Sequence, residues 1–269
     1  KQEVRNYIVE NVSRILDTSG ISYVKWDMNR HSVAVGAKAH AYILGFYEVM
    51  ERIFAPRPHI LLETCSSGGN RFDLGVLCYG PQVWCSDNTD PISRLTIQGN
   101  LSYLYPQSTF GAHVSASPHA QPLRSTPLTT RGNVSFFGCL GYELDLKHLV
   151  AIEVQEIKDQ IEFYKQHRRL FQFGSFRRLK NGWQVSLEGV TAAGVFHTLV
   201  DPSPAYEQLR LTGLEKGKRY HLRTRAQKLR IGQFAHLIKH VAPVNLDPNG
   251  TVLRTADKHY GLEDGAEGY

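Results

Sequence analysis

Asp27 is the first acidic side chain whose surroundings point to chemistry. It lies in the segment Tyr23-Val-Lys-Trp-Asp-Met-Asn-Arg30, which begins as a short apolar run and then turns polar. Side chains alternate along a strand, so Lys25, Asp27 and Asn29 share one face and Trp26 points to the other. A positive charge two residues away favours an ionised carboxylate, which is the form that a nucleophile needs. A surface salt bridge at a strand end explains the same residues.

A second acidic pair follows a predicted strand, in the segment Trp84-Cys-Ser-Asp-Asn-Thr-Asp90. Glycoside hydrolysis uses two carboxyl groups that flank the scissile bond, one protonated and the other ionised. Asp87 ends its strand beside Trp84 and Cys85, and apolar neighbours favour the protonated form. Asp90 precedes a predicted helix and is typical of a helix N-cap. We therefore expect Asp87 to act as the acid and Asp90 to be structural.

A glycine-rich segment, Glu63-Thr-Cys-Ser-Ser-Gly-Gly-Asn-Arg-Phe-Asp73, lies between the two acidic segments. Gly68 and Gly69 allow the backbone to approach a ligand closely, and the small side chains around them suit a sugar rich in hydroxyl groups. Neither of the glycine patterns that cradle phosphates is present. A tight turn with a local ion pair between Arg71 and Asp73 explains the same residues.

The sequence predicts no metal and no cofactor. His113 and His119 lie on or after a predicted strand, but no HxxxH or HExxH spacing accompanies them. We interpret them as ordinary loop or core histidines. The Gly-x-Ser-x-Gly elbow, which positions the nucleophile of many serine hydrolases, is not found in the sequence either.

The elements that must position these residues alternate between strand and helix. Apolar spacing and turn residues predict helices over 2–18, 36–54, 92–104 and 147–170, and strands over 21–26, 59–63, 82–86, 110–115 and 134–139. This order is typical of a parallel sheet with right-handed crossovers. Polar residues gather directly after the strands, where both a (β/α) barrel and a doubly wound sheet place their active sites.

The pattern changes near residues 170–175. Beyond this boundary, short apolar segments at 183–188, 194–200, 206–212 and 219–225 are separated by glycine, proline or asparagine turns, before a helix predicted over 226–238. Short strands of this kind predict an antiparallel β domain of the sandwich type.

The composition is that of a soluble globular protein. The 269 residues are 42% hydrophobic and 21% charged, and no run approaches the roughly 18 apolar residues that cross a bilayer. The first ten residues hold no apolar signal core, and the chain begins without Met inside a predicted helix, which suggests a start within a longer protein. Four cysteines without CxxC spacing favour reduced thiols and a cytoplasmic location.

Positive charge is concentrated in one segment. Residues 165–240 hold 15 Lys and Arg against 4 Asp and Glu, whereas the whole chain carries a net charge of +6. A basic nucleic-acid-binding module would have such a segment, and steep salt dependence would be its signature. The basic residues are spread between apolar strand positions without a compact run, so we favour charges on outer strand faces and expect neither a nucleic acid nor a membrane as a partner.

Five motifs together resemble glycoside hydrolase family 36, the α-galactosidases. They are KWDMNR, ETCSSGGNRFD, WCSDNTDP, GAHVSASP and TRGNVSFFGCLGYELDL, in that order over residues 1–170. The resemblance implies that Asp27 is the nucleophile and Asp87 the general acid/base of a retaining α-galactosidase. It also implies that Lys25 and Asn29 bind galactose and that Cys65 and Gly68 line the sugar site. We add Trp26 to the candidate substrate-binding residues.

The resemblance also implies how the chain is organised. Residues 1–172 would be the C-terminal part of a catalytic (β/α)8 TIM-type barrel, and residues 173–269 an incomplete C-terminal β-sandwich domain. Ser67 and Asn70 depart from the glycine run that is usual in the family, so the contacts of this loop with the sugar would differ. Because the first barrel strands of the family precede Lys1, we expect the chain alone to be inactive.

The implied substrate is an oligosaccharide of the raffinose or melibiose type with a terminal α-linked galactose. A galactosyl transferase of the raffinose-synthase kind would use the same two carboxylates, and the sequence leaves that alternative open. We expect the full-length protein to form a homo-oligomer.

Overall fold

The computed structural model describes residues 1–29, 36–199, 208–215, 217, 219–225, 227–228 and 251–252. No helix within these residues combines the length and the apolar character that a bilayer crossing requires. The predicted segments 206–212 and 226–238 lie partly or mostly outside the described residues.

The first part of the chain is a three-stranded parallel sheet with two helices. Its elements are α1 (Gln2–Asp17), β1 (Tyr23–Asp27), α2 (Ala39–Phe54), β2 (Leu61–Cys65) and β3 (Gln82–Val83), and the strand order is β1-β2-β3. Apolar side chains at helical spacing pack α1 and α2 against the sheet around Met50, Ile53 and Leu62, all of which are buried. The predicted helices and strands of this part are confirmed, although β3 is only two residues long.

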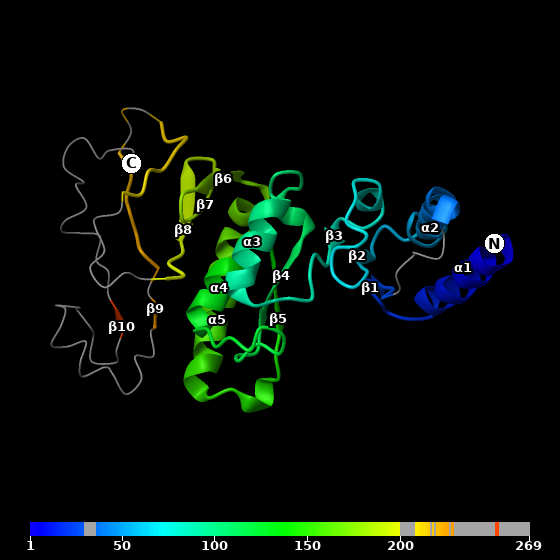
Figure 1. The fold of residues 1–269 in the computed structure, drawn as a ribbon, viewed down its shortest axis with the longest axis horizontal. Coiled ribbons are helices and arrows are strands. Elements are labelled where there is room, and N and C mark those ends of the chain that lie inside the picture. The colour runs from blue at the N-terminus through cyan, green and yellow to red at the C-terminus, as the bar shows by residue number, and fades with distance from the viewer. Residues whose placement is uncertain are drawn as a thin grey trace.

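The second part holds the next two parallel strands and three helices. Its elements are α3 (Pro91–Leu101), β4 (Gly111–Ser115), α4 (Leu128–Ser135), β5 (Cys139–Glu143) and α5 (Ala151–Phe173). Strands β4 and β5 pair in parallel, and a single parallel bridge between Val83 and Phe110 joins them to the first sheet. Figure 1 shows this succession, with α1 and α2 near one end and α3, α4 and α5 beside β4 and β5.

One sequence prediction for this part is wrong. We predicted a strand over 134–139, but Val134 belongs to α4 and the strand β5 begins only at Cys139. The apolar residues Val134, Phe136 and Phe137 suggested a strand, yet they are buried at the end of α4 in a cluster with α5. Short apolar runs do not distinguish a buried helix end from a strand, and here tertiary packing decides.

An antiparallel sheet follows α5. Strands β6 (Ser175–Leu179), β7 (Gly182–Leu187) and β8 (Val190–Val195) pair in the order β6-β7-β8. Trp183 and Val185 of β7 are buried in the same cluster as Phe137 and Phe171, so this sheet shares a hydrophobic core with α4 and α5. Among the described residues of 208–225, none belongs to a strand, unlike our prediction. Two two-residue strands, β9 (Gln227–Lys228) and β10 (Thr251–Val252), form an antiparallel pair.

Candidate active site

The carboxyl end of β1 presents a polar face. Tyr23, Lys25 and Asp27 are all exposed and alternate with partly buried residues, as the strand period requires. Across the parallel pair, Lys25 lies opposite Glu63 and Asp27 opposite Cys65. The structure therefore brings four chemically active side chains of two neighbouring strands together at one sheet end.

Glu63 is a functional candidate that the sequence analysis missed. Its carboxylate is almost completely buried, and Oε1 lies 3.4 Å from Nζ of Lys25. Oε2 accepts hydrogen bonds from the hydroxyl of Tyr23 at 2.7 Å and from the side-chain amide of Gln82. A charged residue within the apolar run 59–63 was the available signal, because an interior carboxylate is rarely tolerated without partners.

The thiol of Cys65 lies beside the proposed nucleophile. Burial raises the pKa of this thiol to about 11, and a hydrogen bond to the Asp27 carboxylate acts in the same direction against a backbone contact at Gly68. The thiol therefore stays protonated at neutral pH and can donate to Asp27. Cys65 is thus positioned to orient the carboxylate rather than to react as a thiolate.

The glycine-rich loop is joined to the end of β1 by two hydrogen bonds. The Ser66 hydroxyl donates to the Met28 carbonyl, and the Ser67 amide N–H donates to Oδ1 of Asn29, both at 2.8 Å. Ser67 has a φ of 46°, in the left-handed region that residues with a side chain rarely adopt. Asn29, which the resemblance assigns to galactose binding, therefore also holds this loop.

Gly68 connects this loop to the segment that carries Asp87. It has a φ of 79°, and a Cβ at this position would lie 2.8 Å from Cα of Ser86 and 3.2 Å from the amide nitrogen of Asp87. Only a residue without a side chain permits this approach of two backbones. The loop thus lies between the carboxyl end of β1 and the second acidic residue.

Asp87 is held by the side chain of Trp84. The indole Nε1 donates a hydrogen bond to Oδ1 of Asp87 at 2.9 Å, and the ammonium of Lys25 lies 4.4 Å from the centre of the same indole. Trp84 is buried, whereas Asp87 is exposed to solvent. The apolar surroundings that we expected for the Asp87 carboxyl are therefore not present in this chain by itself.

Asp90 has the structural role that the sequence predicted. It caps α3, where its side chain accepts a hydrogen bond from the Ser93 amide at 2.9 Å. It is fully buried and forms an ion pair with Arg124. Asp90 therefore caps the helix and is inaccessible, whereas the Asp87 carboxyl of the same segment is exposed.

Trp26 is not brought to this group. Its ring packs in the hydrophobic cluster of α1 and α2 and meets the Phe54 ring edge to face, with 6.4 Å between the ring centres. Strand alternation places it on the face opposite to Lys25 and Asp27. We correct its role from a substrate contact to a partly buried packing residue.

His113 and His119 both interact with other side chains of the protein. His113 pairs with Glu143 at 3.5 Å, and the hydrogen bond from His113 lowers the pKa of the Glu143 carboxyl. The Nε2 atom of His119 lies 2.9 Å from the hydroxyl of Thr89. Across the part of the chain that the structure describes, no group of three or more His, Cys, Asp or Glu side chains is arranged to hold a metal ion.

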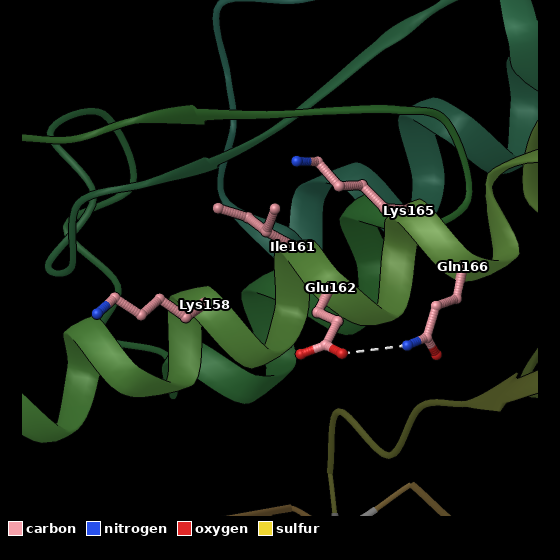
Figure 2. Close-up of a pocket in the computed structure, with 5 residues that line it drawn as sticks. All are labelled: Lys158, Ile161, Glu162, Lys165 and Gln166. Carbon is pink, nitrogen blue, oxygen red and sulfur yellow. Dashed lines mark hydrogen bonds between the residues drawn. The ribbon is translucent and has the colours of Figure 1, made fainter.

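A surface hollow of about 480 Å³ lies elsewhere on the molecule. Figure 2 shows its lining side chains, all of which come from α5: Lys158, Ile161, Glu162, Lys165 and Gln166. Glu162 accepts a hydrogen bond from Gln166 at 3.2 Å, as is usual for neighbours one turn apart on an exposed helix face. None of the candidate site residues lines this hollow.

Several arginines of the basic segment 165–240 have partners within the protein. The guanidinium of Arg178 lies 3.7 Å from the centre of the Tyr103 ring, and that of Arg225 lies 5.1 Å from the centre of the Phe136 ring. Arg169 pairs with Glu188 at 3.4 Å. These contacts favour our interpretation for these three arginines, whose charges serve the packing and the surface of the fold.

The chain is similar to known proteins over most of its described residues. The family model described as Melibiase matches residues 1–174. The chain is 44% identical over 241 residues to Alpha-galactosidase AgaA of Geobacillus stearothermophilus, which covers 82% of this chain and 33% of that protein. It is 49% identical over 191 residues to Alpha-galactosidase 1 of Pediococcus pentosaceus, which covers 67% of this chain and 26% of that protein.

Solved structures show the same likeness. The crystal structure of the GH36 α-galactosidase AgaA superposes with a TM-score of 0.75 at 45% identity, over 80% of this chain and 33% of that chain. The α-galactosidase of Lactobacillus brevis superposes with a TM-score of 0.78 at 40% identity, over 82% of this chain and 33% of that one. This chain thus spans about a third of the length of AgaA. With a family match over more than half of its residues, the chain belongs to the Melibiase family, among the α-galactosidases of glycoside hydrolase family 36.

Proposed function

We propose that this chain supplies the two catalytic carboxyl groups of a retaining α-galactosidase. The proposal rests on one observation, which is that Lys25 and Trp84 connect the surroundings of the Asp27 carboxyl to those of the Asp87 carboxyl. Asp27 follows Lys25 on one face of β1, and the Lys25 ammonium lies over the indole that donates to Asp87. AgaA structures in complex with raffinose and with stachyose support an α-galactoside oligosaccharide as the substrate.

The mechanism is a double displacement. Asp27 attacks the anomeric carbon while Asp87 protonates the departing glycosidic oxygen, which forms a galactosyl-enzyme. Asp87 then deprotonates a water molecule, which releases galactose with retention of configuration. The Lys25 ammonium donates to a sugar hydroxyl, while Asn29, Cys65 and Gly68 line the sugar site.

The proposed architecture follows from the strand order. The five parallel strands β1 to β5 form the C-terminal part of a (β/α)8 barrel over residues 1–172, with Asp27 at the carboxyl end of β1 and Asp87 after that of β3. Residues 173–269 form part of a C-terminal β-sandwich domain that begins with β6, β7 and β8. A barrel of five strands leaves two open edges, so we expect the chain to require further barrel strands for activity.

Two further properties of the whole protein remain predictions. Four cysteines without CxxC spacing favour reduced thiols and a cytoplasmic location. A homo-oligomer is expected for the full-length protein. Transfer of galactose to a sugar acceptor would use the same two carboxyl groups, so it stays the alternative activity.

A chimeric enzyme tests the proposal. In this chimera, the matching segment of the present chain replaces that of AgaA, to which it is 44% identical. We expect the chimera to hydrolyse p-nitrophenyl α-galactoside and to release α-galactose first, as followed by NMR, whereas the purified chain alone is inactive. A folded chimera without activity, or one that releases β-galactose first, would contradict the proposal. Galactosyl transfer that exceeds hydrolysis at high sucrose concentration would favour the transferase.

A further inference from the structure

Trp84 lies between the two halves of the candidate site. Its side chain is 3% exposed, and its single hydrogen-bond donor, Nε1, is directed at Oδ1 of Asp87 at 2.9 Å. A hydrogen bond that is donated to a carboxylate fixes one orientation of a group that otherwise rotates freely. The position of the Asp87 carboxyl therefore depends on the position of the indole.

The same indole contacts the β1 side of the site. The Lys25 ammonium lies 4.4 Å from the ring centre, within the range of a cation–π interaction. The Lys25 ammonium also lies 3.4 Å from the buried Glu63 carboxylate. The indole and Glu63 together define where the Lys25 ammonium lies.

Neighbouring residues leave the indole little freedom. The His113 ring lies 4.4 Å from the indole, centre to centre, and the Arg94 guanidinium lies 5.1 Å from its centre. A Cβ at Gly111 would lie 2.9 Å from Cε3 of the indole, so β4 passes directly against the ring. Close packing of this kind holds a side chain in one rotamer.

We propose that Trp84 is a positioning residue, which holds the Asp87 carboxyl and the Lys25 ammonium in one fixed arrangement. The inference rests on the proposed function of Asp87 as the acid. A positioned acid matters most when the leaving group needs protonation, and it matters little when the leaving group departs as a stable anion. Loss of the indole N–H therefore has a signature that depends on the leaving group.

The experiment compares two substrates in the chimeric enzyme. In Trp84→Phe, which keeps an aromatic ring and removes the N–H, we expect kcat/KM to fall about 10- to 100-fold for phenyl α-galactoside. For 2,4-dinitrophenyl α-galactoside, we expect kcat/KM to change less than about threefold, because its leaving group needs no proton. The ratio of the two values does not depend on the fraction of folded enzyme.

Two further variants keep the test decisive. Trp183→Phe alters an equally buried tryptophan in the cluster of α4, α5 and β7 and should leave the ratio unchanged. Gly111→Ala leaves Trp84 in place and pushes against its ring, so it should reproduce the signature even when Trp84→Phe does not fold. Equal losses on both substrates, or no loss on either, would overturn the inference.

The proposed function has its own control in the same assay. Asp87→Ala should lose kcat/KM on phenyl α-galactoside and keep much of its kcat/KM on the dinitrophenyl substrate, because kcat/KM reports only the steps that lead to the galactosyl-enzyme. If Asp87→Ala shows no dependence on the leaving group, the assignment of the acid fails. If it shows that dependence and Trp84→Phe does not, only the role of Trp84 fails.

Discussion

Lys25 on β1 and Glu63 on β2 are direct partners across a parallel strand pair, with Nζ of Lys25 3.4 Å from Oε1 of Glu63. The Glu63 side chain is 1% exposed and that of Lys25 is 39% exposed. The carboxylate is thus shielded from water while its partner reaches the open face that Asp27 shares. The pair connects the core of the sheet to the proposed chemistry.

This relationship predicts an asymmetric effect on stability. Lys25→Met leaves a buried carboxylate without its positive partner. We expect the free energy of unfolding to fall by about 1–3 kcal/mol. This is less than is usual for a fully buried pair, because Lys25 is partly exposed. The double variant Lys25→Met with Glu63→Gln removes the unpaired charge and should recover part of that loss. The measurement is the thermal unfolding midpoint of the chimeric enzyme. Equal midpoints for the single and the double variant would show that the pair is not coupled.

Gly68 and Gly189 form a matched pair of glycines. Their φ angles are 79° and 80°, but a Cβ at Gly68 would lie 2.8 Å from Cα of Ser86, and a Cβ at Gly189 meets nothing within 4 Å. Gly189→Ala should therefore cost about 1 kcal/mol from backbone strain alone. Gly68→Ala should cost about 1–3 kcal/mol more, because the Ser86 backbone must move.

Activity should separate the same two variants. Displacement of the Asp87 segment in Gly68→Ala should lower kcat/KM at least about 10-fold, while Gly189→Ala keeps the activity of the parent. Thermal unfolding and hydrolysis of p-nitrophenyl α-galactoside measure both effects. Similar losses for the two variants would mean that the contact between the two backbones is unimportant.

The Cys65 thiol should be unreactive at neutral pH. Its pKa is raised to about 11 from the ordinary value of 9.0, chiefly by burial, so the thiolate that alkylating reagents require is scarce near pH 8. Treatment with iodoacetamide followed by mass spectrometry should find the exposed Cys78 modified and Cys65 intact. Equal modification of both cysteines in the folded enzyme at pH 8 would contradict this.

The same raised pKa gives a sign for the dependence of stability on pH. The unfolded chain loses the Cys65 proton near pH 9, and the folded chain holds it until about pH 11. The stabilising contribution is therefore complete below pH 9 and is lost as the pH rises through about 11. Cys65→Ser should flatten the fall of the unfolding midpoint over this window, relative to the parent.

Azide rescue should distinguish the two carboxyl groups by the product that forms. Asp27→Ala should lower kcat at least about 10⁴-fold, and azide should enter the vacated side to give β-galactosyl azide. Asp87→Ala should lower kcat about 10²- to 10⁴-fold on substrates that need acid catalysis, and azide should yield the α-azide from the galactosyl-enzyme. NMR of the isolated azides identifies the anomers. The opposite pattern of anomers would exchange the two roles.

The sequence alone determined the succession of strands and helices around the site. Strand alternation from Tyr23 to Asp27 placed Lys25 and Asp27 on one face, and the structure has that face exposed. The N-cap role of Asp90 was equally predictable, because a short acidic residue before Pro91 satisfies amides that the first helical turn leaves open. Both features depend only on residues that are near one another in the sequence, so they can be predicted from the sequence alone.

Tertiary structure alone decided which distant residues meet. The burial of Glu63 beneath Lys25, and the hydrogen bond from Trp84 to Asp87 under the same ammonium, depend on the pairing of β1, β2 and β3. Packing against α5 likewise made residues 134–135 the end of a helix instead of a strand. Contacts between strands depend on the strand register, and contacts across a core depend on how side chains pack. The hydrophobic periodicity of a single segment determines neither.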